Sequence, residues 1–504
     1  MPNGPGAGRL QSIGAAVGID LERDAAEFFA EQIDQTLRTY YRPLESMSDE
    51  PPPVRFARTP GFRPAPPDNP FNAWYWRTEI HGNDDGPLAG RTVAVKDNIA
   101  VAGVPMMNGA STLEGYVPEF DATVVDRLLE AGATITGKSN CEYFCFSGSS
   151  HTNALGQTHN PWKHGYSTGG SSSGSAALVA GGIADLAIGG DQGGSVRVPS
   201  SFCGLYGMKP TYGLVPYTGA MAVETMLDHL GPMTSSVADN ALLLDVLAGP
   251  DGLDPRQRPM PTGGYLDALG GSVDGVRVGI LTEGFGHDHS EGDVDEMVRR
   301  AAENLTKLGV EVTEVSVPEH RVGMSAWIPI AVEGVISQLF DQTGCTTGAP
   351  GFQPTSLIDR HRATMGNGNE FPDILKMAVL MGRYLIDDYG MHYYARAQNV
   401  VRRLRAAYDG ALSGVDLLVL PTSPTKAHAL PDVDADRKGL LAPGFAPITN
   451  AAPFNPTEHP ALSVPVGLSD GLPVGMMIVG PHAGEREIYR LAHSIEQAGD
   501  WRTA

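Results

Sequence analysis

Apolar residues recur along this chain in two patterns, as short continuous runs and at steps of three and four residues. Short apolar runs are typical of buried strands, and three- and four-residue steps are typical of helices that bury one face. The runs predict strands at 91–96, 133–136, 183–188, 276–281, 310–317 and 415–420. The steps predict helices at 20–41, 121–131, 176–180, 236–248, 293–308 and 485–497. Because strands and helices alternate, we expect an α/β protein with a central sheet.

Three local features add detail. A polar turn separates two apolar runs, which predicts a hairpin of strands at 462–466 and 474–479. Ser236 and Asp239 have the spacing of a capping box at the start of one predicted helix. Residues 325–411 carry helical patterns and little strand signal, so we expect a largely helical insert there.

The first 70 residues differ from the rest. Residues 1–20 are mostly small residues and glycine and are expected to fray, while the helix at 20–41 carries an apolar stripe. Proline-rich sequence then breaks regular structure up to residue 70. We therefore predict a helical arm with a linker, 1–70, and one main domain, 71–504. The stripe can pack on the main domain or on a second copy of the chain, and we expect a homodimer.

Composition restricts the class of protein. The hydrophobic share of 41% supports a sizeable core, and the 62 glycines and 39 prolines favour many short loops. A net charge of −22 argues against a nucleic-acid partner, which needs clustered basic residues. Four cysteines in 504 residues do not form a disulfide framework. No signal peptide or membrane-length apolar run is evident, so we expect a cytoplasmic protein without a membrane partner.

The most informative stretch, 165–210, holds two serine clusters framed by glycine, at 169–175 and 193–195. Glycine allows close backbone approach, so each cluster can form a tight loop that aims hydroxyl and amide groups at one point. The alternative is a flexible linker, the usual meaning of a Gly/Ser run. The cluster is short and apolar sequence follows it at once, which favours the loop.

Lys96 stands at the end of a predicted buried strand, where its charge is disfavoured. Considered alone, Lys96 fits better a lysine whose stem packs while its head reaches water. Considered together with the two serine clusters, Lys96 becomes a candidate catalytic residue, because an unprotonated buried lysine can act as a general base. Ser171 could then relay a proton from Ser195 as nucleophile. The backbone amides that could bind an oxyanion are those of Gln192, Gly193, Gly194 and Ser195.

Other catalytic templates fit poorly. The chain has no H-E-x-x-H and no phosphate-loop motif. A G-x-S-x-G match at 170–174 lacks the strand that a nucleophile elbow requires. His287 and His289 lie in a polar loop without further metal ligands, and Cys141 and Cys145 have no second pair to complete a zinc site. His229 could be a catalytic base, but its sequence context fits better a histidine that packs against its neighbours and caps a turn.

Four segments together resemble the amidase signature family. They are VAVKDN around Lys96, GGSSSGS from Gly169, GDQGGSVRVP from Gly190 and FCGLYGMKPT from Phe202. The resemblance is specific from about 91 to 248 and weaker to the C-terminus. The chain is most similar to the bacterial enantioselective amidases found beside nitrile hydratases.

The resemblance implies a mixed β-sheet flanked by helices and a Ser–cis-Ser–Lys triad that needs no metal and no cofactor. It makes Ser195 the nucleophile, Ser171 a relay beside a cis peptide bond and Lys96 the base. It also assigns the amides at 192–195 to the oxyanion. The residues expected to support these loops are Asp191, Arg197 and Ser172.

The same subgroup implies hydrolysis of short aliphatic or aryl amides to an acid and ammonia through an acyl-enzyme. Phe146, Trp327 and Ile448 are candidate pocket walls, although each also fits ordinary core. The family usually has glycine where Ser173 stands, which leaves the backbone angles of that loop open. Three alternatives remain: hydrolysis of anilides, carbamates or hydrazides, the glutaminase component of a tRNA-dependent amidotransferase, and a silent binding protein.

Overall fold

The computed structural model describes residues 3–345, 347, 350–432, 434–442 and 444–503. The chain divides into two compact units, Met1–Pro52 and Pro53–Ala504, so the boundary falls near the start of the proline-rich stretch and not at residue 70. In the first unit, helices α1 (Ala7–Ala16) and α2 (Arg23–Thr36) contact each other. The expectation that residues 1–20 fray is wrong over α1.

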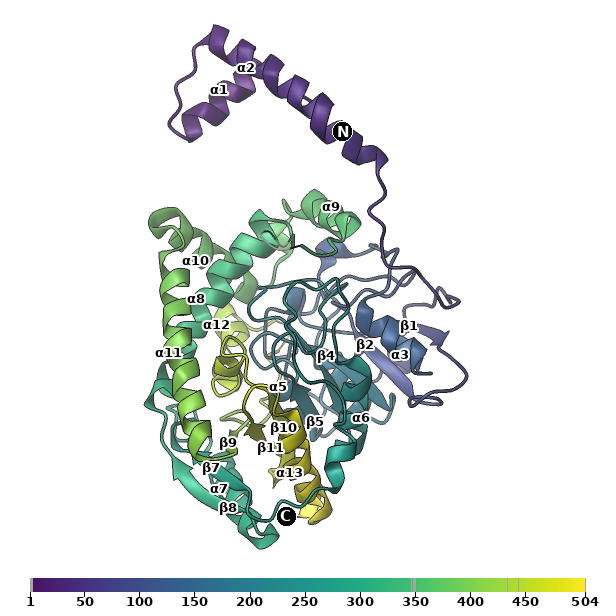
Figure 1. Cartoon of the computed structure of the whole chain (residues 1–504), viewed down its shortest axis with the longest axis vertical. Coiled ribbons are helices and arrows are strands. Elements are labelled where there is room, and N and C mark those ends of the chain that lie inside the picture. Colours follow the sequence, from purple (N-terminus) through teal and green to yellow (C-terminus); the bar gives the residue numbers. More distant parts are fainter. Residues whose placement is uncertain (1–2, 346, 348–349, 433, 443, 504) are drawn as a thin grey trace. The chain divides into compact units, whose positions relative to one another are not determined.

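The described part of the second unit contains an eleven-stranded mixed sheet in the order β1-β3-β2-β4-β6-β5-β10-β11-β9-β7-β8 (Figure 1). Strands β2, β3 and β4 are mutually parallel, as are β7, β8 and β9, and the remaining neighbours are antiparallel. The strands are β1 (Trp74–His81), β2 (Thr92–Lys96), β3 (Thr134–Ser139), β4 (Leu186–Asp191), β5 (Tyr206–Lys209), β6 (His229–Thr234), β7 (Arg277–Leu281), β8 (Glu311–Val315), β9 (Leu417–Pro421), β10 (Ala461–Ser469) and β11 (Leu472–Val479).

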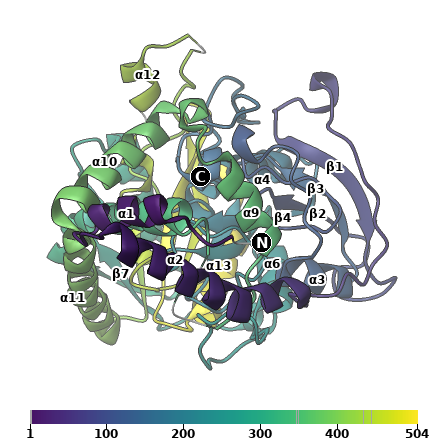
Figure 2. The same ribbon diagram turned by 90° about the horizontal axis from the view of Figure 1, so that it is seen from above.

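Helices flank this sheet (Figures 1 and 2). They are α3 (Thr123–Glu130), α4 (Ser173–Ala180), α5 (Arg197–Cys203), α6 (Val237–Leu247), α7 (Gly292–Asn304), α8 (Gly323–Val335), α9 (Thr355–Thr364), α10 (Asp373–Tyr389), α11 (His392–Gly414), α12 (Arg437–Leu441) and α13 (Glu485–Gln497). The predicted cap is present, because Ser236 Oγ accepts the Asp239 amide at 3.1 Å at the start of α6. The predicted insert at 325–411 is largely helical, from α8 to α11.

All six predicted strands and both strands of the predicted hairpin are present, with ends shifted by a few residues. Strands β1, β5 and β6 were not predicted. Strand β6 reads HLGPMT, and glycine and proline are weak strand formers. It forms because it lies between β4 and β5, where every one of its residues is buried.

One helical segment, Pro318–Asp341, is long and apolar enough by composition to cross a membrane, with a mean hydropathy of 1.3 over its window. Of that window, 67% is buried inside the protein. Burial of this kind is also found in the core helix of a soluble domain, so the segment is weak evidence for a membrane span.

The sheet topology places Lys96 beside the serine loops. Strands β2 and β4 are parallel neighbours, with Val95 opposite Ile188. Their carboxyl ends therefore meet at one edge of the sheet, where Lys96 ends β2 and the turn to Ser195 follows β4. The carboxyl edge of parallel strands is a common position for functional sites in α/β proteins.

Candidate active site

The Lys96 side chain is fully buried at the end of β2. Its Nζ donates to Ser171 Oγ at 2.8 Å and to the Gly190 carbonyl at 3.0 Å. Lys138, also fully buried on the neighbouring strand β3, instead forms an ion pair with Asp97 at 2.9 Å. Among the described residues, no carboxylate forms such a pair with Lys96. The Lys96 amine is therefore placed to exchange a proton with Ser171.

Ser171 lies in the loop before α4, and the peptide bond between Gly170 and Ser171 is cis. The Glu142 amide donates to the Ser171 carbonyl at 3.1 Å. Ser172 Oγ donates to the Gly190 carbonyl at 3.1 Å and accepts the Gly190 amide at 3.2 Å. These bonds connect the loop to the end of β4.

Ser195 lies in the turn between β4 and α5, and this turn contains a buried ion pair. Arg197 donates from Nε to Asp191 Oδ2 at 3.0 Å and from Nη2 to Oδ1 at 2.9 Å. Asn455 Nδ2 donates to Asp191 Oδ1 at 2.9 Å. Burial acts to raise the pKa of Asp191, but Arg197 and Asn455 outweigh it and hold that pKa well below its usual range. Asp191 is therefore a carboxylate that fixes the turn carrying Ser195.

The backbone amides at 192–195 differ in their partners. The Gly194 amide donates to Asp191 Oδ1 at 2.7 Å. It is thus not available to an oxyanion, contrary to the expectation from sequence, because the carboxylate that fixes the turn already takes its proton. Within the part of the chain that the structure describes, the amides of Gln192, Gly193 and Ser195 donate to no protein acceptor. These three amides remain as candidate donors.

Trp327 of α8 holds the backbone of this turn from the other side. Its Nε1 donates to the Gln192 carbonyl at 2.8 Å. A Cβ added to Gly193 would come within 2.6 Å of the Trp327 ring, so the close approach requires glycine at this position. Trp327 therefore orients the peptide that links Gln192 to Gly193, a contact that the sequence did not predict.

Ser195 lines a cleft of ≈ 450 Å³, counting the space open to solvent. The three predicted pocket residues line the same cleft: Phe146, Trp327 and Ile448. The other apolar walls are Val223, Leu227, Ala331 and Phe445. A cleft with aromatic and aliphatic walls suits an apolar substituent next to the reacting carbon.

Cys145 also lines this cleft and was not predicted as a site residue. Its thiol interacts with Lys96 and Ser171. Burial acts to raise the pKa of Cys145, but hydrogen bonding with Cys141 and, when Lys96 is protonated, the Lys96 charge outweigh it and lower that pKa to about 7. A neutral Lys96 leaves the thiol less acidic than this. Cys145 is thus a second potential nucleophile beside Ser195, and experiments must distinguish the two.

The other supporting residues could not be found from sequence either. Glu142 is fully buried, its Oε2 accepts from Thr152 Oγ1 at 2.8 Å, and its backbone amide donates to the Ser171 carbonyl, so it connects the Ser171 loop to Thr152. Asn455 comes from a segment far along the chain and carries no motif of its own. Ser173 is the first residue of α4 and has no positive φ, so serine fits where the family usually has glycine.

The histidines considered from sequence have other contacts. His229 is buried, and its Nδ1 lies 2.7 Å from the Leu227 carbonyl. His287 and His289 contact side chains at 449–450. None of the three lines the cleft that contains Ser195. The packed-side-chain interpretation of His229 fits these contacts.

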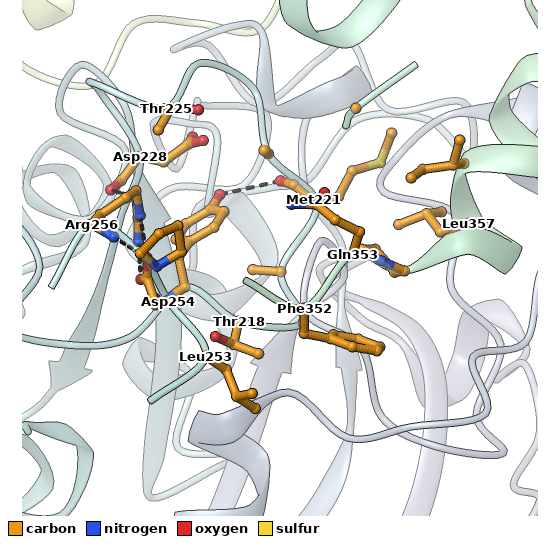
Figure 3. Close-up of a pocket in the computed structure, with 18 of the residues that line it drawn as sticks. Thr218, Met221, Thr225, Asp228, Leu253, Asp254, Arg256, Phe352, Gln353 and Leu357 are labelled. Atoms are coloured by element: carbon orange, nitrogen blue, oxygen red, sulfur yellow. Dashed lines mark hydrogen bonds and ion pairs between the residues drawn. The ribbon is translucent and has the colours of Figure 1, made fainter. Parts of the chain in front are cut away.

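A larger hollow of ≈ 690 Å³ adjoins this region without containing Ser195 (Figure 3). It is lined by Tyr217, Asp254 and Arg256 among others, and shares no lining residue with the cleft. Tyr217 connects the two, because its hydroxyl accepts from Gln192 Nε2 at 3.1 Å and donates to the Met221 carbonyl at 3.2 Å. The smaller cleft is the better candidate site, since it contains both the serine and the free amides.

Lys209 is another buried lysine, and changing it tests whether a lowered pKa or a contact with a serine marks the catalytic base. Burial, followed by the charge of Arg197, lowers its pKa from 10.5 to about 7, yet its Nζ donates to the Pro210 carbonyl at 3.0 Å and not to a serine. Between about pH 7 and 10.5, Lys209 binds a proton in the unfolded chain but not in the folded chain. The contribution of Lys209 to the free energy of unfolding therefore rises over this range by about 1.4 kcal/mol per pH unit.

We therefore expect Lys209→Met to keep turnover and to remove that rise. Urea unfolding at several pH values, with amide hydrolysis measured in parallel, checks both parts. A Lys209→Met enzyme that lost turnover while staying folded would contradict the choice of Lys96 over Lys209.

Comparison with known proteins decides the family. The family model described as Amidase matches residues 70–489. This chain belongs to the amidase signature family. It is 43% identical to an enantioselective amidase of Rhodococcus rhodochrous over 99% of this chain and 96% of that protein.

Two solved structures show the same fold. The A-type component of a glutamyl-tRNA(Gln) amidotransferase from Thermotoga maritima has a TM-score of 0.69 and 31% identity, covering 82% of this chain and 84% of that one. A peptide amidase in complex with the competitive inhibitor chymostatin has a TM-score of 0.66 and 30% identity, covering 82% and 84%. This amidase is therefore an amide-hydrolysing enzyme by family, with its candidate site at Lys96, Ser171 and Ser195.

Proposed function

We propose that this amidase hydrolyses small amides through an acyl-enzyme formed on Ser195. In the first step an unprotonated Lys96 takes the Ser171 hydroxyl proton while Ser171 Oγ takes the proton of Ser195 Oγ. Ser195 Oγ attacks the amide carbon, and the amides of Gln192, Gly193 and Ser195 bind the resulting oxyanion. The proton returns through Ser171 to the leaving nitrogen, and ammonia departs. Water then repeats the sequence against the acyl group, releasing the acid and restoring Ser195.

One observation carries the proposal: the 2.8 Å contact between Lys96 Nζ and Ser171 Oγ, in a position without solvent. A neutral amine has two N–H donors and one lone pair. It can therefore donate to the Gly190 carbonyl and still accept a proton from Ser171. A charged amine at this site would have only a hydroxyl and a carbonyl as partners, and a buried charge without a counter-ion is costly.

The walls of the cleft support a substrate whose acyl group is apolar. Phe146, Trp327 and Phe445 supply aromatic surface, and Ile448 supplies aliphatic surface. The Rhodococcus relative, described as an enantioselective amidase, matches this chain over nearly its whole length. We therefore place aryl and short aliphatic primary amides first, and anilides, carbamates or hydrazides second, since the same acylation serves them all.

The alternative is a component that supplies ammonia for tRNA-dependent amidation. It is favoured by the likeness to the Thermotoga maritima amidotransferase. In sequence, such an amidotransferase component from Synechococcus matches 83% of this chain, whereas the enantioselective amidase matches 99%. The difference in coverage favours an enzyme that works without a partner protein.

The test is turnover by the pure chain alone. Incubated with benzamide, an aliphatic amide, an anilide and glutamine, the chain is expected to release acid and ammonia from benzamide without any added protein or tRNA. Product acid is measured by chromatography and ammonia by an enzymatic assay. Activity on glutamine alone, or only in the presence of a partner protein, would favour the amidotransferase instead.

A further inference from the structure

Three side chains outside the cleft converge on one point. They are Asp409 of α11, His459 just before β10 and His482 just after β11. One ligand atom from each lies within 4.8 Å of the other two. His459 Nε2 is 3.1 Å and His482 Nδ1 is 3.7 Å from Asp409 Oδ1. None of the three lines the cleft that contains Ser195.

Hydrogen bonds on the far side of each ring fix the tautomers. Thr457 Oγ1 donates its one proton to the Pro453 carbonyl at 3.0 Å, so at 3.1 Å from His459 Nδ1 it acts as an acceptor. His459 therefore carries its proton on Nδ1. The Thr457 carbonyl can only accept, and His482 Nε2 lies 3.0 Å from it, so His482 carries its proton on Nε2.

With both rings neutral, the ring nitrogens nearest Asp409 carry lone pairs and no proton. His459 Nε2, His482 Nδ1 and Asp409 Oδ1 are all acceptors, and an arrangement of three acceptors at these distances is repulsive unless a cation lies between them. A proton on either ring would relieve part of the repulsion, and the Asp409→Asn variant below tests for one. The His459 side chain is 0% exposed, however, and burial disfavours the charged ring.

We propose that Asp409, His459 and His482 bind one divalent transition-metal ion of the zinc type. Neutral imidazole nitrogen and a carboxylate oxygen are ligands that Zn²⁺ accepts at about 2.0–2.2 Å, which places tetrahedral ligand atoms about 3.4 Å apart. The two separations from Asp409 Oδ1, 3.1 and 3.7 Å, bracket that value, and the two histidine nitrogens lie within 4.8 Å of each other. Asp409 is exposed, so ions can enter and water can complete the coordination.

Each histidine of the proposed site also has a hydrogen-bond acceptor for the ring nitrogen that faces away from the metal. Histidine ligands to a metal usually donate their other N–H to a carbonyl or similar acceptor, which holds the ring in place. Here a single residue, Thr457, serves both rings, one through its hydroxyl and one through its carbonyl. The neighbouring charge of Arg405 is offset by Glu458 at 3.0 Å. The ion would link α11 to both ends of the β10–β11 hairpin.

The first experiment titrates ZnCl₂ into the full-length protein after its metals are stripped with EDTA, using calorimetry and thermal unfolding. We expect one ion per chain and a rise in melting temperature on binding. Thr457→Val should weaken binding about 10–100-fold, because it frees the His459 ring while leaving all three ligands. His289→Ala, an exposed histidine in a different cluster, is the matched control and should bind as the wild type does. No saturable binding up to millimolar zinc would overturn the proposal.

A second variant separates a metal from a simple ion pair. Asp409→Asn removes the carboxylate charge and offers an amide N–H to the His459 Nε2 lone pair. The proposal predicts that this variant binds no zinc and, without metal, melts at a higher temperature than the metal-free wild type. If His459 or His482 instead holds a proton in a stable pair with Asp409, the variant melts at a lower temperature, and the proposal is overturned.

Discussion

Ser195→Ala is expected to lower kcat by about 10⁶-fold, because the groups of a nucleophile–base unit act together and removing one disables the rest. KM for benzamide should change little, since the apolar walls of the cleft remain. The measurement is steady-state hydrolysis of benzamide with detection of the product acid. Residual activity within about 10-fold of wild type, a change of only about 1.4 kcal/mol in barrier height, would exclude Ser195 as the nucleophile.

Lys96→Met belongs to the same prediction, because it keeps the buried stem and removes only the amine. We expect kcat to fall by at least about 10³-fold, in the range for loss of a general base. Ser173→Ala is the matched control: Ser173 lies two positions from Ser171, it is fully buried, and its Oγ has no polar partner among the described residues. Its turnover should stay near that of wild type.

Arg197→Met is expected to give the largest loss of stability among single changes, about 3–5 kcal/mol in the free energy of unfolding. The change leaves Asp191 as a fully buried carboxylate without its ion-pair partner. Arg197 also donates to the Ala451 carbonyl at 2.7 Å and to Asn455 Oδ1 at 2.7 Å, and both acceptors lose their donor. Urea unfolding followed by tryptophan fluorescence measures the effect.

Two further variants test the cause of that loss. Asp191→Asn combined with Arg197→Met removes the stranded charge and should recover part of the stability without restoring turnover, because the turn that carries Ser195 is no longer fixed. Arg299→Met breaks an exposed pair with Glu314 and should cost far less. A double variant as unstable as Arg197→Met alone would show that packing, not charge, is responsible.

Much of the fold follows from local patterns. The predicted strand at 91–96 is β2 and the predicted helix at 485–497 is α13. The same patterns place Lys96 and the 193–195 serine cluster after β2 and β4, which are parallel neighbours, so their meeting at one edge of the sheet is a consequence of strand order. Strand β6 could not be found in this way, because its stability comes from neighbours on both sides and not from its own residues.

The details of the site depend on contacts between distant segments. The bonds from Asn455 to Asp191 and from Trp327 to Gln192 join residues more than a hundred positions apart. The Gly194 amide is not free to bind an oxyanion because it donates to the Asp191 side chain, and the spacing of residues in the sequence cannot reveal this contact. Hydrophobic periodicity carries no information on such contacts, so the free amides had to be identified in three dimensions.

The most direct test of the central claim is to locate the acyl group during turnover. The enzyme is acid-quenched while hydrolysing a slow anilide, digested and analysed by peptide mass spectrometry. We predict an acyl mass on the peptide that contains Ser195, and its absence in both Ser195→Ala and Lys96→Met. An acyl group on Cys145, which shares the cleft, would contradict the proposed chemistry.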